Sequence, residues 1–169
     1  MSKARRDPRA SFQSEMTPSA RVRETAFERP RGVGQVETRR GFCQVHVEGL
    51  PEPVVPKRLE ALGAVAEEGI SIDFLKLTPR GLSFVAPADR AGDIERVLAG
   101  AQVARDRSVV SVHAVNIRDE EGLLAEIVQE AIALGAQIDH VGDGHDRLLL
   151  VVGDADAARI ETHFRAKIK

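Results

Sequence analysis

The sequence predicts an α+β fold built from two copies of one βαββαβ unit, and three observations support it. Apolar and polar residues alternate over 43–47 and 70–74, which is typical of strands with one buried face, and a mostly apolar strand at 82–86 follows a turn. Apolar residues also recur at helical spacing, at Leu59, Leu62, Val65 and Ala66. Finally, this succession occurs twice along the chain.

The repeat has an offset of 66 residues. Residues 69–73 (Gly-Ile-Ser-Ile-Asp) match 135–139 (Gly-Ala-Gln-Ile-Asp), and the strand at 82–85 matches 148–151. An internal repeat of this length indicates two equivalent units, each near the lower end of domain size.

The first unit, residues 41–106, has strands predicted at 43–47, 70–78, 82–86 and 101–105, with a hairpin turn at 78–81. A helix begins at Pro56, because the first turn needs no N–H there, and ends near Gly69. A short second helix points Ile94, Val97 and Leu98 inward. This order is the ferredoxin-like, split βαβ arrangement.

The second unit, residues 107–169, follows the same order. Strands are predicted at 110–115, 135–139 and 148–151, with a turn at 143–146. Asp119 caps a helix, and Asp154 caps a last one. Their predicted inward faces are Leu123, Leu124, Ile127, Val128 and Ala131, and Ala158, Ile160 and Phe164. Little chain remains for a fourth strand, so segment 32–40 is predicted to complete this unit from upstream, with a strand at 33–37 and a turn at 39–41.

Composition excludes several classes of protein. The 169 residues are 43% apolar and 30% charged, and a formal net charge of -2 gives no general attraction for nucleic acid or anionic membranes. No apolar run approaches the roughly 20 residues of a membrane helix, and the N-terminus lacks the apolar core of a signal peptide. We therefore expect a cytoplasmic protein without a membrane partner. Cys43 is the single cysteine, so we expect no disulfide and a buried, unreactive thiol.

Residues 1–31 form a basic segment that we expect to be mostly disordered. The segment carries eight Lys and Arg residues but few large apolar ones, and three prolines interrupt it. Its arginines suit a contact with RNA or an acidic partner, but a solvated tail is the simpler interpretation, and nucleic acid is not an expected partner.

The sequence contains no catalytic constellation. It has no P-loop, and its five histidines show no metal-ligand spacing, so we expect no metal and no cofactor. His46 and His113 are interpreted as sheet residues and His145 as a turn residue.

A binding site is instead predicted from the geometry of each unit. The loop after the first strand meets the start of the second strand near a helix N-terminus, whose free N–H groups and dipole attract a carboxylate. Ser71 or Gln137 would bind the other end of a small zwitterion, and Asp73 or Asp139 would face its ammonium group. The alternative is that these loops are tight only because the fold needs tight connections, with the aspartates solvated.

Residues 31–164 resemble the tandem ACT-domain regulatory region of aspartokinases. Segment 32–37 is similar to the strand that opens that region, and 49–52 (Gly-Leu-Pro-Glu) to its Gly-Val-Pro-Asp loop. Residues 69–73 resemble its Gly-Ile-Asn-Val-Asp strand, 82–85 its Ile-Ser-Phe-Thr strand, and Gly122 stands where its second unit has Pro-Gly. The kinase domain with its Lys-Phe-Gly-Gly signature is missing from the sequence, so the chain resembles the free regulatory subunit of aspartokinases.

This resemblance implies two ACT-type units and a non-catalytic regulatory function in amino-acid metabolism of the aspartate family. It implies a homodimer formed side by side through the sheets, an amino-acid ligand such as lysine or threonine between units, and a separate kinase catalytic chain as a further partner. The bound amino acid would favour one arrangement that the partner reads. The implied ligand contacts are Leu50, Glu52, Pro56, Ser71 and Asp73 in one unit, and Asn116, Arg118, Gly122, Gln137 and Asp139 in the other.

Two alternatives remain open. Ser71 and Gln137 replace the family's asparagine, Leu77 replaces a glutamine, and 142–145 replaces a Ser-Thr-Ser-Glu segment. A polar pocket that loses such partners loses affinity, so the chain is also consistent with a degenerate scaffold that only dimerises or docks onto a separate catalytic chain. In the other alternative, the basic tail binds nucleic acid while the two units dimerise it.

Overall fold

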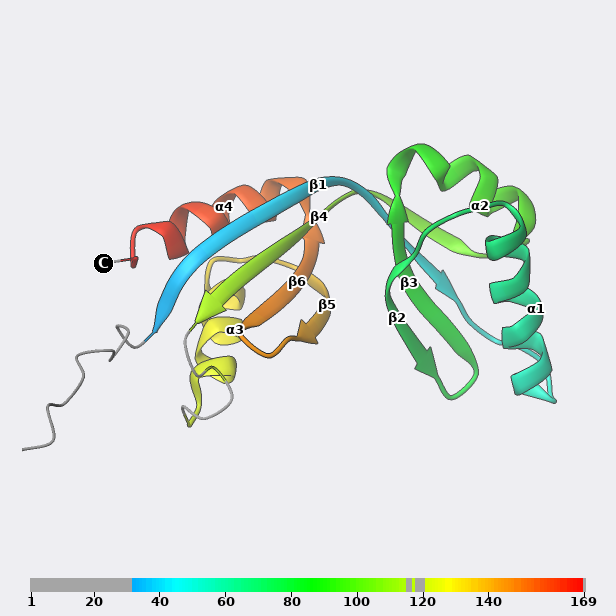
Figure 1. Cartoon of the computed structure of the whole chain (residues 1–169), viewed down its shortest axis with the longest axis horizontal. Coiled ribbons are helices and arrows are strands. Elements are labelled where there is room, and N and C mark those ends of the chain that lie inside the picture. Colours follow the sequence, from blue (N-terminus) through cyan, green and yellow to red (C-terminus); the bar gives the residue numbers. More distant parts are fainter. Residues whose placement is uncertain (1–31, 115–116, 118–120, 169) are drawn as a thin grey trace, which may run out of the picture.

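The computed structural model describes residues 32–114, 117 and 121–168, and it confirms the α+β fold class. Within these residues, six strands form one antiparallel sheet and four α-helices pack on it (Figure 1). The predicted disordered tail, residues 1–31, and the predicted helix cap Asp119 lie outside the described residues.

The elements follow the predicted order. They are β1 (Val33–Val47), α1 (Val54–Glu67), β2 (Asp73–Thr78), β3 (Gly81–Pro87), a 3-10 turn (Ala88–Arg90), α2 (Ala91–Val97), β4 (Gln102–Ala114), α3 (Leu123–Ala133), β5 (Ile138–Asp143), β6 (Arg147–Gly153) and α4 (Asp154–Arg165). The strand order in the sheet is β2-β3-β1-β4-β6-β5, so β1 and β4 are central and β2 and β5 are the two edges.

Strands β1 and β4 are each continuous, although the sequence predicts two separate strands in each place. The predicted turn at 39–41 is an irregularity inside β1, where Gly41 has a φ of 82° and the register with β4 shifts between Arg39 and Phe42. In β4, Asp106 has a φ of 55°. The prediction was wrong because a left-handed residue within paired strands bends them without reversing the chain.

Each long strand serves both halves of the molecule. The start of β1 pairs with the end of β4, where Val36 lies opposite Val112, and the end of β1 pairs with the start of β4, where Val45 lies opposite Val103. We call α1, α2, β2 and β3, with the end of β1 and the start of β4, the first unit. We call α3, α4, β5 and β6, with the start of β1 and the end of β4, the second unit (Figure 1). The predicted boundary between residues 106 and 107 stays a prediction.

Each unit has its own hydrophobic core on one face of the sheet. In the first, Val45, Phe84 and Ile94 are buried together with Val65 of α1. In the second, α3 and α4 cover the core, whose largest members include Ile127, Leu148, Leu150, Ile160 and Phe164. Fully burying a side chain of this size contributes about 1.5–3 kcal/mol, so these two clusters hold the helices on the sheet.

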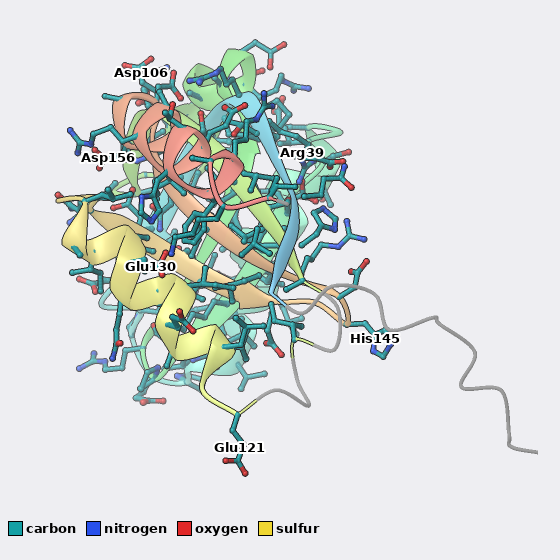
Figure 2. The ribbon with its side chains drawn as sticks, turned by 90° about the vertical axis from the view of Figure 1, so that its left-hand side faces the viewer. Arg39, Asp106, Glu121, Glu130, His145 and Asp156 are labelled. Carbon is teal, nitrogen blue, oxygen red and sulfur yellow. The ribbon has the colours of Figure 1, made fainter. Side chains whose placement is uncertain are left out.

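Helices α3 and α4 are also joined by a charged contact. Glu130 of α3 lies beside α4 (Figure 2), with Oε2 2.9 Å from His163 Nε2, and Lys167 Nζ donates a hydrogen bond to Oε1. Burial raises the pKa of Glu130, but the hydrogen bonds from Lys167 and His163 outweigh burial and hold this pKa below its usual value. The carboxylate therefore stays charged and ties the two helices together.

The equivalence of the two units extends to the connections after α1 and α3. Gly69 and Gly135 have φ values of 67° and 74°, and the next N–H groups, of Ile70 and Ala136, donate back to helix carbonyls at 3.2 and 3.3 Å. This is the usual glycine C-terminal motif of a helix. Because these N–H groups are used by the helices, β2 and β5 begin at Asp73 and Ile138, three residues later than predicted.

Three details of the predicted helices are wrong. Helix α1 begins at Val54, so Pro56 is its third residue, which is still in the first turn where an N–H has no intrahelical partner. Leu59 is 66% exposed and Ala66 is exposed, whereas Val54 and Val65 are the buried residues of α1. In α4, Ala157 rather than Ala158 points inward.

None of the helices in the described part of the chain has the length and apolar character needed to cross a bilayer.

Candidate ligand-binding site

A cavity of about 400 Å³ lies where the two units meet, and we call it the seam cavity. Gln44 lies opposite Ala104, and His46 opposite Gln102, across β1 and β4. Since alternate residues of a strand point to opposite faces, these side chains lie on the face away from the core that holds Val45. The lining residues are Gln44, His46, Gln102, Val103 and Ala104 from the first unit, and Asp139 of β5 from the second.

The polar groups of the seam cavity suit a small polar molecule. The amides of Gln44 and Gln102 can each donate and accept hydrogen bonds. Nε2 of His46 lies 2.7 Å from Glu48 Oε1, and the Asp139 carboxylate accepts a hydrogen bond from Arg107 Nε at 2.6 Å. The seam cavity is open on one side, so a small molecule in it would meet these polar groups while staying partly in water.

The His and Cys side chains described elsewhere in the structure lie apart from the seam cavity, except for His46. Among the residues that the structure describes, no three His, Cys, Asp or Glu side chains are placed to hold a metal ion. Burial raises the pKa of the Cys43 thiol, whose Sγ lies 3.7 Å from the Pro87 carbonyl oxygen, so this thiol stays protonated and enclosed. His145, in the turn between β5 and β6, points away from the body of the protein (Figure 2).

Two of the five predicted site residues of the first unit make hydrogen bonds within the fold, and the other three are exposed. The N–H of Leu50 donates to the Arg80 carbonyl at 2.9 Å, which fixes the loop. Glu52 Oε2 accepts the Val54 N–H at 3.2 Å, so a carboxylate of the chain already occupies the start of α1. The other predicted residues of this unit, Pro56, Ser71 and Asp73, are exposed, and Asp73 lies 3.7 Å from Arg39.

The predicted residues of the second unit lie apart from one another. Gly122, with a φ of 83°, precedes α3 and accepts the Glu126 N–H at 2.9 Å. The backbone N–H of Gln137 donates to Asp156 Oδ2 at 2.9 Å, and its side chain is exposed. Asp139 lines the seam cavity, whereas Gly122 and Gln137 do not. Asn116 and Arg118 lie outside the described residues.

Sequence reasoning missed most of the residues that line the seam cavity. Gln44 and His46 alternate with Cys43 and Val45, so the pattern indicates only a polar sheet face. Nothing local indicates that β5 of the other unit covers part of that face. The polar Gln44 and His46 in one strand were the available signal, but such residues usually face water.

The topology defines the class of this fold. Two interlocked βαββαβ units, with helices on one face of each part of the sheet, form a tandem ferredoxin-like fold. A scan against models of protein families finds no match to this sequence, and a search of curated protein sequences finds none either.

Solved structures do match, and those described below are an aspartate kinase regulatory subunit and chains of aspartokinases. The ligand-free regulatory subunit of aspartate kinase from Thermus thermophilus superposes with a TM-score of 0.71 at 18% identity, over 82% of this chain and 100% of that chain. A chain from a structure of aspartokinase alpha and beta subunits gives 0.70 at 18% identity, over 81% and 98%. E. coli aspartokinase III in complex with lysine and aspartate gives 0.64 at 14% identity, over 83% of this chain and 34% of that chain. The predicted resemblance is thereby confirmed at the level of the fold.

Proposed function

We propose that this protein is a non-catalytic regulatory module that binds a small amino acid in the seam cavity. The observation that carries the proposal is that the cavity has walls from both units: Gln44 and Gln102 from one, and Asp139 from the other. A molecule that touches both units stabilises the arrangement in which those walls are together. Binding is then linked to the relative position of the units, which a partner chain can read.

The chemistry of the walls favours a zwitterion. Gln44 and Gln102 offer amide donors to a carboxylate and amide acceptors to an ammonium group. The charge of Asp139 is compensated by Arg107, so this pair can hydrogen-bond to a ligand without attracting free cations. The solved structure of E. coli aspartokinase III, named as a complex with lysine and aspartate, supports an amino acid as the class of ligand.

The exposed apolar residues of the first unit support a homodimer. Leu75 and Leu77 of β2 and Val55 and Leu59 of α1 are exposed large hydrophobic residues. We call these four residues the α1–β2 edge. Arg58, adjacent to Leu59, donates hydrogen bonds to the carbonyls of Thr78, Pro79 and Gly81, which keeps α1 beside the β2–β3 turn. An apolar patch next to an unpaired edge strand favours association with a second copy of the chain.

A separate kinase catalytic chain is the further partner that we propose, since a chain in the structure of aspartokinase alpha and beta subunits has this fold. A second candidate function is a scaffold that dimerises or docks without a ligand. This candidate is favoured by Glu52, whose carboxylate occupies the donor at the start of α1 that a ligand carboxylate was predicted to use.

A thermal-shift screen of the common amino acids, with matched variants, tests the proposal. A ligand at 100 times its Kd stabilises the folded state by about 2.7 kcal/mol, which raises Tm measurably. Gln44→Leu should abolish the shift, whereas Gln137→Leu, the same change at a predicted residue outside the seam cavity, should keep it. The reverse result would place the ligand at the site predicted from the sequence, which includes Gln137. No stabilisation by any amino acid at millimolar concentration would reject ligand binding and leave the scaffold.

A further inference from the structure

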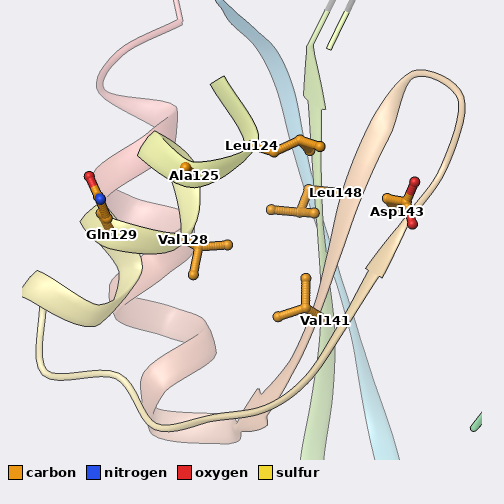
Figure 3. A pocket seen from close by; sticks show the side chains of 7 residues that line it. All are labelled: Leu124, Ala125, Val128, Gln129, Val141, Asp143 and Leu148. Carbon is orange, nitrogen blue, oxygen red and sulfur yellow. The ribbon is translucent and has the colours of Figure 1, made fainter. Parts of the chain in front are cut away.

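The second unit carries an apolar groove of about 460 Å³ on the helix side of the sheet, which we call the α3–β5 groove. Figure 3 shows Leu124 and Val128 of α3 on one side, and Val141 and Leu148 of the β5–β6 hairpin on the other. The groove opens directly over the core of the second unit, since Leu148 is part of that core and Leu124 and Val128 pack against it. Ala125, Gln129 and Asp143 complete its lining.

The groove lies at an edge of the sheet, because β5 pairs only with β6 among the strands that the structure describes. An apolar surface beside an edge strand promotes unwanted association, and proteins usually cover such an edge with a helix or a segment of chain. Val141 of β5 is one of the exposed large hydrophobic residues of the protein. The groove therefore calls for a covering segment with at least one large apolar side chain.

The chain enters the fold at the same end of the sheet. Val33, the first residue of β1, lies opposite Ala114, and the Ala114 N–H donates to Asp146 in the β5–β6 turn at 3.0 Å. Val33 also packs against the core over which the groove opens. Leu148 of β6 lies opposite Val112 of β4, so Leu148 is two strands away from β1. With a strand spacing of about 4.8 Å, Val33 and Leu148 are roughly 12 Å apart.

The sequence upstream of Val33 supplies an apolar side chain at a suitable distance. Phe27 precedes Val33 by six residues, and six extended residues span up to about 20 Å. Residues 26–27 (Ala-Phe) are flanked by Arg23 and Arg29. An aromatic side chain can therefore reach the groove while the arginines remain in water.

Net charge favours this placement as well. Residues 1–31 contain eight Lys and Arg and four Asp and Glu, a net charge of +4, so with -2 for the whole chain the remaining residues carry -6. Opposite net charges raise the local concentration of the segment at the surface of the folded part. The folded part of a second copy carries the same net charge as the groove's own surroundings and has no such advantage.

We propose that the segment around Phe27 folds back and inserts the Phe27 side chain into the α3–β5 groove of its own chain. The segment then covers the β5 edge and leaves the α1–β2 edge as the open apolar edge of the sheet. The two units, although repeats of one sequence pattern, thereby differ in which surface is available to a partner.

The full-length chain has no Trp and no Tyr, so Phe27→Trp places a single fluorophore in the segment. In the groove, its emission should be shifted to shorter wavelength and its quenching by acrylamide several-fold weaker than for an exposed tryptophan. Ala125→Arg, which fills the groove from an exposed position, should remove both effects. Ala133→Arg, the same change at the exposed end of the same helix, should leave both unchanged.

Limited trypsin digestion of the chain with native Phe27 gives a second readout. Cleavage after Arg23 and Arg29 should be several-fold faster in Ala125→Arg than in Ala133→Arg. Full acrylamide quenching of the tryptophan in the Phe27→Trp chain, or equal cleavage rates in the two arginine variants, would overturn the proposal. So would protection that disappears on dilution, because the groove would then hold the segment of a second copy.

Discussion

Phe74 on β2 and His140 on β5 make an edge-to-face contact, with ring centroids 6.0 Å apart, although these strands are the two opposite edges of the sheet. Gly142 allows this approach, since a Cβ at position 142 would lie 2.8 Å from Phe74 Cε1. The left-handed residues Gly41 and Asp106 lie in the two central strands. The sheet thus bends until its edges meet on the helix-free face, over the buried side chains of Val85, Val109 and Val151. Asp139, the neighbour of His140 in β5, lines the seam cavity.

The contact predicts a loss of stability in mildly acidic solution. Burial, and then the positive charge of Lys76, lower the pKa of His140 below its ordinary value of 6.5. The unfolded chain, with a histidine pKa of about 6.5, therefore binds a proton more readily than the folded chain below that pH. The contribution of His140 to the free energy of unfolding should be fully present above about pH 6.5. It should decrease as the pH falls from there toward the lower pKa of the folded state.

Urea unfolding of His140→Gln, measured at several values between about pH 5 and pH 7.5, checks this prediction. The variant should show a flatter dependence of the unfolding free energy on pH than the parent protein. His145→Gln, the same change at an exposed turn residue, should keep the parent's slope. An unchanged slope in His140→Gln would mean that another group is responsible.

The sequence predicted the repeated pattern of strands and helices well, because alternation and helical spacing are local signals. It did not predict that 33–47 and 102–114 are continuous strands, since Gly41 and the polar residues around Asp106 have the composition of turns. It also missed the seam cavity, because the contact of Phe74 with His140 joins residues from two units. A site built between units leaves no spacing signal in either.

The partly buried ion pair Arg107–Asp139 should contribute more to stability than its exposed counterpart Arg39–Asp73. The two aspartates are equivalent in the repeat, but Asp139 is only 14% exposed and lies 2.6 Å from Arg107. Arg107→Ala leaves that carboxylate without its partner and should cost about 1–3 kcal/mol of unfolding free energy. Arg39→Ala, at a half-exposed pair 3.7 Å apart, should cost at most about 1 kcal/mol. Equal losses in urea unfolding would contradict this ranking.

Gly81 should not tolerate a side chain. This buried residue begins β3, and a Cβ there would overlap the backbone carbonyl oxygen of Val47, which cannot move aside without disturbing the pairing of β1 with β3. We expect Gly81→Ala to destabilise the protein by about 3 kcal/mol, at the upper end of overpacking effects. Gly63→Ala is the control, because nothing lies near that position in α1 and alanine favours a helix, with a gain of up to about 1 kcal/mol. Thermal unfolding of both variants compares the two.

If the proposed homodimer forms through the α1–β2 edge, charged substitutions in that edge should weaken it. Leu59 is 66% exposed and Leu77 is 55% exposed, so Leu59→Arg and Leu77→Lys should leave the fold of the monomer unchanged while placing charges in the interface. Each change should raise the dimer Kd at least about tenfold, which corresponds to about 1.4 kcal/mol, in sedimentation equilibrium. Ile132→Arg changes a 57% exposed residue of α3 in the other unit and should leave the Kd unchanged. If Ile132→Arg dissociates the dimer and the leucine variants do not, the two copies associate through the second unit. In that dimer, the β5 edge cannot be covered by the chain's own N-terminal segment.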